Sequence, residues 1–491
     1  MVQRHPTAWF AQRAALAIAL MVGFYVLALS VVGVLIWIPF AEWRYLHRVD
    51  PRLAFFCLAG AVAILTSVVP RKDHFTPPGP RLDEHDHPAL FRVLRDVAAA
   101  TDQRMPSDVY LLNEVNAFVA ERGGRMGVGG VRVMGVGLPL IQALTVDELR
   151  SVIAHEFGHY WSGDLRLGPW IHKTHAAIAK AIDNLGEGIL TVPFAWYNRV
   201  FLRVTMAVSR RQEFVADEVA ARVTSPRAAA AALERVAVAA PAFSLYVQSE
   251  VLPAVHSGFL PPLAAGFERF LQASRVKELM SRFIARPDES REVHAFDTHP
   301  PLDERLAALA GLATTARNEG LVEPASALLT APETLAESLL RFANDDDIVG
   351  RLKSIDWSEV GDLVFAAQWR AVSEHFAASL ETFNVDSLPC GDAETLEAGR
   401  RLLGPGEARL VDRDAAHERA NRVLSAALGC CLMSRGWSLK TSIGEPLLLV
   451  RGPEKIDPQA IVAGLSKGTL DRDEWKRRTV ALGLAGCPLS T

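Results

Sequence analysis

Two histidines four residues apart, with a glutamate directly after the first, are the residues whose types and spacing could do chemistry. The segment is His155-Glu156-Phe157-Gly158-His159. On a helix, side chains four residues apart lie on one face, so both imidazoles can reach one metal ion. Glu156 lies beside them, where its carboxylate can take a proton from a metal-activated water. The pattern predicts a zinc-dependent hydrolytic site, and the alternative is a pair of surface histidines next to a glutamate.

A catalytic zinc ion needs a third protein ligand and one open position. In the extended form of this motif a histidine follows six residues after the second one, but Leu165 occupies that position. Glu213 and Asp217 are the best replacement, because carboxylates four residues apart share one helical face. One could bind zinc while the other accepts a hydrogen bond from a ligand imidazole. Asp164 is the rival ligand, and a solvated acidic face is the structural alternative.

Two helices must position these side chains. Thr145 followed by Glu148 is typical of a capping box, so we expect a helix to begin there. This helix should continue through Trp161 and stop near Gly163. A second helix, expected over about 206–221, presents the two carboxylates. The histidines and the carboxylates are therefore predicted to face each other from two helices.

The remaining pattern predicts a mostly α-helical chain with a small β-sheet. Residues 108–112 and 131–136 are typical of strands, and the glycine-rich residues 123–130 between them indicate a turn. The pattern changes after residue 319. There, a helix-rich region precedes two expected strands, 438–442 and 446–451. We predict that residues 320–491 form a separate α/β accessory domain without a recognisable active site.

Two uncharged apolar runs near the N-terminus predict a transmembrane hairpin. Residues 14–40 and 53–70 contain no Asp, Glu, Lys or Arg. At about 1.5 Å rise per residue, each run is long enough to cross a hydrocarbon core of about 30 Å. A short polar segment, 41–52, joins them. A cleaved signal peptide fits less well, because the first run is too long and a second one follows.

Other features bear on the location of the chain. Residues 170–204 are amphipathic and interrupted by charge, which favours a surface or interfacial segment over a third membrane pass. The five cysteines form no CxxC pair, which favours reduced thiols and disfavours a cysteine zinc site. The formal net charge of −4 does not indicate nucleic-acid binding. We expect an integral protein of the cell (inner) membrane, with the catalytic domain on the cytoplasmic side.

Five blocks of the sequence, in order, resemble the HtpX-type and CaaX-prenyl-protease metallopeptidases of peptidase family M-48. The resemblance spans about Pro88 to Leu309. The blocks are Asn116-Ala117-Phe118, the segment Glu148 to His159 with Gly163-Asp164 after it, Ser209-Arg210 with Glu213 and Ala216-Asp217, His299-Pro300-Pro301, and Arg305. The joint pattern is specific, although the region after the zinc helix is more charged than in the branch with four clear transmembrane helices.

This resemblance implies a thermolysin-like (gluzincin) site in a zincin-like domain. The site would hold one zinc ion per chain, with Glu213 as the third ligand beside His155 and His159. Asp217 would accept a hydrogen bond from one of these histidines.

The resemblance also implies roles for residues outside the two helices. The segment Asn116-Ala117-Phe118 would be an edge strand that pairs with an extended substrate. His299 would face the reaction centre and stabilise the oxyanion, with Arg305 nearby.

Together these observations predict a membrane-anchored zinc endopeptidase. Residues 1–75 would form the transmembrane hairpin, residues 76–319 the metallopeptidase domain and residues 320–491 the accessory domain. Its partners would be the lipid bilayer and protein or peptide substrates, chiefly membrane proteins undergoing quality control. Two alternatives are a chaperone that binds unfolded chains and cleaves little, and a membrane-anchored scaffold that acts through its C-terminal domain.

Overall fold

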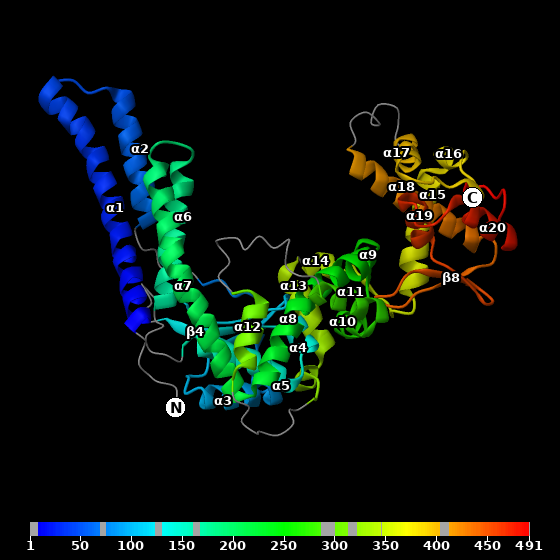
Figure 1. The fold of residues 1–491 in the computed structure, drawn as a ribbon, viewed down its shortest axis with the longest axis horizontal. Helices are drawn as coiled ribbons and strands as arrows, with labels where there is room; N and C mark the ends of the chain where they lie inside the picture. The colour runs from blue at the N-terminus through cyan, green and yellow to red at the C-terminus, as the bar shows by residue number, and fades with distance from the viewer. Residues whose placement is uncertain are drawn as a thin grey trace. The chain divides into compact units, whose positions relative to one another are not determined.

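The computed structural model describes residues 8–68, 75–122, 130–160, 167–285, 300–312, 322–344, 346–402 and 412–490 (Figure 1). The chain divides into two compact units. The first comprises Met1–Ala240 with Ile284–Ala343, and the second comprises Pro241–Phe283 with Asn344–Thr491. The domain boundaries at residues 75 and 319 stay predictions.

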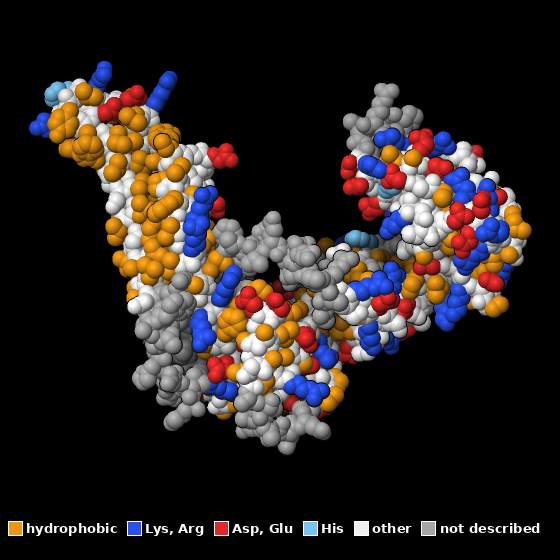
Figure 2. Space-filling view, in the orientation of Figure 1, with side chains coloured by type: hydrophobic (Ala, Val, Ile, Leu, Met, Phe, Trp, Pro, Cys, Tyr) orange, Lys and Arg blue, Asp and Glu red, His pale blue; other side chains and the backbone are white. Residues whose placement is uncertain are grey.

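The first unit begins with the predicted helical hairpin, which the structure confirms. Helix α1 (Ala8–Leu46) and helix α2 (Pro51–Val68) are both apolar and long enough to span a membrane. Large apolar side chains on the hairpin point outward, as the orange surface in Figure 2 shows, and Phe55 is 75% exposed. Such side chains suit a lipid environment. A third stretch, Pro226–His256, meets the same criteria of length and composition.

A second pair of helices packs against this hairpin. Helix α6 (Leu167–Leu185) and helix α7 (Thr191–Val223) contain the segment predicted to be amphipathic. Phe194 and Phe201 are fully buried in a cluster with residues of α1 and α2. The Tyr197 hydroxyl donates to the carbonyl oxygen of Leu20, and the Asn184 side-chain amide donates to the Ser67 hydroxyl at 2.9 Å. Part of the apolar surface of residues 170–204 is therefore covered by the hairpin.

The sheet of the first unit has four strands in the order β1-β2-β4-β3. Strand β2 is parallel to β4, whereas the β1–β2 and β3–β4 pairs are antiparallel. The predicted strands at 108–112 and 131–136 are confirmed, and β3 lies at one end of the described sheet. Most of the expected turn at 123–130 lies outside the described residues. The strands are β1 (Arg81–Leu82), β2 (Asp108–Leu112), β3 (Ala117–Arg122) and β4 (Val131–Gly137).

Further helices of the first unit pack against the sheet, against α7 or against one another. Their apolar residues are spaced for one buried face, as in α3, where Leu90, Leu94 and Val97 are fully buried. The helices are α3 (Pro88–Ala100), α4 (Leu138–Ala143), α5 (Val146–Gly158), α12 (Leu302–Ala310) and α13 (Pro332–Ala343), with most of α8 (Pro226–Tyr246).

The second unit has two apolar cores. One contains Tyr246, Phe267 and Trp357 and includes helices α9 (Leu252–His256), α10 (Leu263–Gln272) and α11 (Ser274–Ala285). The other surrounds α18 (Arg413–Met433). Further elements are α14 (Asp346–Val349), α15 (Ala367–His375), α16 (Ala377–Leu380), α17 (Asp392–Arg401), α19 (Pro458–Lys467), α20 (Arg472–Ala481), and strands β5 (Phe259–Leu260) and β6 (Lys353–Ser354).

The C-terminal strands confirm the predicted α/β character of this region. Strands β7 (Ser438–Lys440) and β8 (Leu448–Arg451) lie within the two expected segments. A third strand, β9 (Glu454–Ile456), was not predicted. It is short and follows directly after a turn at Gly452, which has φ 60°.

The packing of α6 and α7 on the hairpin leads to a prediction. Removing residues 1–71 should not give a soluble enzyme, because the buried faces of Phe194 and Phe201 would join Ile189 and Trp196, which are already exposed. Carbonate extraction and sedimentation should recover this variant in the pellet. Adding Ile189→Ser and Trp196→Ser should raise the soluble fraction. Recovery of the simple deletion in the supernatant would show that α6 and α7 do not depend on the hairpin.

Candidate metal centre and active site

The helix that carries both histidines begins at the predicted capping box. The Glu148 amide donates to the Thr145 hydroxyl, and the Thr145 amide donates to the Glu148 carboxylate at 2.8 Å. Helix α5 ends at Gly158 rather than at the expected Trp161. The Tyr160 amide already bonds to the carbonyl of Phe157, so the chain tightens into a turn. The rival ligand Asp164 lies outside the described residues.

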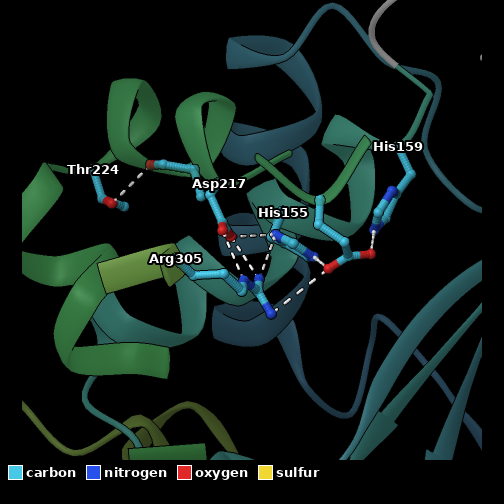
Figure 3. Close-up of polar contacts among 7 residues, drawn as sticks. His155, His159, Asp217, Thr224 and Arg305 are labelled. Atoms are coloured by element: carbon cyan, nitrogen blue, oxygen red, sulfur yellow. Dashed lines mark hydrogen bonds and ion pairs between the residues drawn. The ribbon is translucent and has the colours of Figure 1, made fainter. Parts of the chain in front are cut away.

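His155, His159 and Glu213 come together as a group that could hold a metal ion (Figure 3). Their possible ligand atoms all lie within 4.8 Å of one another. The Nε2 atom of each histidine is 3.6 Å from a carboxylate oxygen of Glu213. This separation is long for a hydrogen bond but close to the roughly 3.3 Å between ligands of tetrahedral zinc. Two imidazoles and a carboxylate are also zinc's usual donors, so these residues fit the ion.

Asp217 and Arg305 lie directly behind His155, on the side away from His159 (Figure 3). The Nδ1 atom of His155 is 2.9 Å from Asp217 Oδ1. Arg305, on α12, donates from Nε and Nη2 to the two oxygens of the same carboxylate, at 2.8 and 2.6 Å. With Nδ1–H donating to Asp217, Nε2 of His155 keeps its lone pair for a metal. The structure thus brings together both members of the acidic pair and Arg305.

The carboxylates around His155 favour a positive charge at this residue. Burial lowers the pKa of His155, but the hydrogen bond to Asp217 and the nearby carboxylates of Glu213 and Glu156 raise this pKa to about 9 overall. Burial would raise the pKa of Asp217, yet the Arg305 and His155 hydrogen bonds hold this pKa below its usual value. Glu213 and Asp217 are 5% and 3% exposed, so they act in a poorly solvated place. Such carboxylates suit a divalent cation.

A close approach between α5 and α7 holds the two candidate histidine ligands near the candidate carboxylate ligand. A Cβ atom on Gly158 would lie 2.9 Å from the Cα atom of Ala216 and 3.2 Å from its Cβ atom. Glycine and alanine therefore permit a separation that larger residues would prevent. His159 and Asp217 are the direct chain neighbours of this contact. Gly158 is not among the predicted site residues, although a glycine inside a helix can indicate such a close contact.

The predicted substrate segment lies at the outer end of the sheet. Asn116 directly precedes β3, whereas Ala117 and Phe118 are its first two residues. The Phe118 ring covers Gly135 of β4, where a Cβ atom would lie 2.4 Å from the ring. The Tyr160 hydroxyl donates to the carbonyl oxygen of Val119 at 2.8 Å, so the end of α5 contacts this strand. Burial raises the pKa of Tyr160 to about 12.

Of the two predicted catalytic residues, Glu156 and His299, only Glu156 lies within the described residues. Glu156 is half-buried on α5, between the two histidines of the sequence, and its charge contributes to the raised pKa of His155. His299 lies outside the described residues. Pro300 and Pro301, which follow it, lead into α12 and therefore to Arg305.

Comparisons with known proteins show what the chain is similar to. The family model described as peptidase family M-48 matches residues 84–313. A "Protease HtpX homolog" from Syntrophobacter fumaroxidans is 26% identical over 251 residues, which cover 46% of this chain and 77% of the relative. A protein of the same name from Paraburkholderia phytofirmans is 28% identical over 255 residues, covering 48% of this chain and 79% of the relative. No solved structure matches the chain.

The three-residue group leads to a prediction about metal content. His155→Ala, His159→Ala and Glu213→Ala should each lose most of about one bound zinc per chain, because each removes one of three protein ligands. Elemental analysis of the purified proteins measures this. Glu218→Ala is the matched control, since Glu218 is on the same helix but pairs with Arg222. Full zinc in Glu213→Ala together with its loss in Asp164→Ala would show that the ligand assignment is wrong.

The contact between α5 and α7 leads to a second prediction. Gly158→Ala should destabilise the fold by about 1–3 kcal/mol and lower metal retention, because the added methyl group pushes the helices apart. Thermal unfolding and zinc content measure the two effects. Gly311→Ala is the control, since its nearest neighbour is a carbonyl oxygen at 3.5 Å. Equal behaviour of both variants would mean that α5 can shift without disturbing the site.

Proposed function

Because the chain belongs to peptidase family M-48 and is a membrane metalloprotease that hydrolyses peptide bonds, we propose that it is a zinc-dependent endopeptidase. The observation that carries this proposal is the convergence of His155, His159 and Glu213 within 4.8 Å. A binding protein would have no need for a general base next to such a group. Glu156 provides this base in the adjacent position.

The proposed zinc ligands are His155, His159 and Glu213. Zinc held there would polarise the carbonyl of the bond to be cleaved and make an attacking water more acidic. Asp217 fixes the orientation of the His155 ring, and Arg305 holds Asp217 through two hydrogen bonds. The protein would thus contribute a set of ligands in which hydrogen bonds hold the His155 ring in place.

Glu156 and His299 are proposed to carry out the proton and charge steps. Glu156 takes a proton from the attacking water and later gives it to the leaving amine. His299 donates a hydrogen bond to the oxygen that gains negative charge in the transition state. Pro300 and Pro301 restrict the backbone next to it. Arg305 is only six residues further on and is already at the site.

The substrate is proposed to bind as an extended strand along β3. This strand is at the end of the described sheet and begins directly after Asn116. A peptide that pairs with Ala117 and its neighbours would be held straight, as cleavage of a main-chain bond requires. Phe118 points towards β4, so its side chain shapes the strand rather than the substrate.

The biological role is proposed from the relatives and the membrane helices. We propose that the catalytic domain, residues 76–319, lies on the cytoplasmic side of the cell membrane and degrades damaged or misfolded membrane proteins. The hairpin of α1 and α2 supports a membrane location, and the names of the relatives support a protease. Residues 320–491 are proposed to be an accessory domain.

Kinetics of two variants test the proposed chemistry. Glu156→Gln should keep the zinc and lose peptidase activity, because the carboxamide cannot accept the proton. His299→Ala should also keep the zinc and lower kcat by about a hundredfold with little change in KM, as expected for one oxyanion donor. Steady-state cleavage of β-casein by the full-length protein measures both. A near-normal kcat in His299→Ala would show that His299 does not act in the reaction. Loss of zinc in this variant would show that His299 is a metal ligand.

A further inference from the structure

The residue after the second histidine makes a contact that the proposed chemistry does not use. Tyr160 follows His159 directly, and its hydroxyl donates to the carbonyl oxygen of Val119 at 2.8 Å. Val119 is the third residue of β3, the strand along which the substrate is proposed to bind. The hydroxyl of a residue beside the metal site therefore occupies a backbone acceptor of this strand.

The hydrogen-bond pattern of β3 shows on which side this acceptor lies. The Gly137 amide donates to the carbonyl of Asn116, so Asn116 faces β4. In an antiparallel pair, the backbone groups of successive residues point alternately towards the partner strand and away from it. The N–H and C=O groups of Ala117 and Val119 therefore point outward. No described strand pairs with this outer side of β3.

Other contacts hold Tyr160 in this position. The guanidinium group of Arg132 lies 4.6 Å from the centre of the Tyr160 ring, and Arg132 also donates to the side chain of Gln103 at 3.3 Å. Gln103 in turn donates to the backbone carbonyl of Tyr160 at 3.3 Å. The ring is thus stacked on one side and its backbone is fixed, so the hydroxyl is directed at Val119.

We propose that Tyr160 is a specificity-determining residue that limits how far a substrate strand can pair with β3. A bound peptide can exchange hydrogen bonds with Ala117, but the next outward acceptor, Val119, already has a donor. The enzyme would then form backbone hydrogen bonds with a short extended segment of the substrate, and substrate amides beyond that segment would not pair with β3. This inference rests on the proposed binding of substrate along β3.

The test compares wild type and Tyr160→Phe on N-methylated peptides. The probes span the bond that the full-length protein cleaves first in β-casein, and each has one backbone amide methylated. Methylation removes the donor that would pair with an outward carbonyl of β3. Tyr160→Phe removes only the hydroxyl and keeps the ring that stacks on Arg132. Tyr246→Phe is the matched control, since its hydroxyl donates to a backbone carbonyl, that of Leu263, at the same distance.

Wild type and Tyr246→Phe should tolerate methylation of the amide that faces Val119. In Tyr160→Phe the same methylation should lower kcat/KM by about threefold to tenfold, the usual effect of one hydrogen bond. Identical methylation profiles in all three proteins would overturn the proposal, as would complete loss of activity in Tyr160→Phe with its zinc retained. If no methylation away from the cleaved bond lowered the kcat/KM of wild type, the proposed binding of substrate along β3 would be wrong. This result differs from one that contradicts only the role of Tyr160.

Discussion

The contact between Gly158 and Ala216 is the constraint on which the rest of the site depends. It brings α5 and α7 close enough for two histidines on one helix to face Glu213 on the other. Neither helix could hold the proposed zinc ion alone, because α5 offers two of the proposed ligands and a catalytic zinc ion needs three. The helix crossing is therefore part of the metal site. Small side chains at this point matter as much as the ligands, since a protein interior cannot absorb an extra methyl group without movement.

Charge balance is the second requirement, and it explains why α12 reaches into the site. Asp217 is 3% exposed, and an isolated carboxylate in such a place would favour its neutral form. A neutral Asp217 could not accept the Nδ1–H hydrogen bond of His155 in the same way. Arg305 prevents this, because its two hydrogen bonds stabilise the charged carboxylate. The orientation of a proposed zinc ligand on α5 thus depends on a residue that follows Asp217 by 88 positions.

Features that depend on neighbouring residues could be predicted from the sequence. Contacts that depend on the folded arrangement of distant segments could not. The capping box at Thr145 and the spacing of His155 and His159 are both contained in one helix, so periodicity and side-chain chemistry suffice to find them. The apolar runs of α1 and α2 are equally local. In contrast, nothing near Tyr160 indicates that its hydroxyl reaches Val119, 41 residues away, because that contact needs the sheet to be in place. The same holds for residues 170–204, because the burial of Phe194 and Phe201 depends on contacts with the distant hairpin.

Helix α7 joins the membrane-associated part of the chain to the metal site without a break. Its 33 residues include Phe194, buried against the hairpin, and Glu213, one of the three proposed ligands. These two positions are 19 residues apart, which is about 28 Å along a helix axis at 1.5 Å per residue. A continuous helix is stiff over this length, so the distance from the hairpin contact to the proposed ligand is fixed by the hydrogen-bonded geometry of the helix. The packing of α7 on the hairpin is therefore linked to the position of Glu213 through one continuous helix.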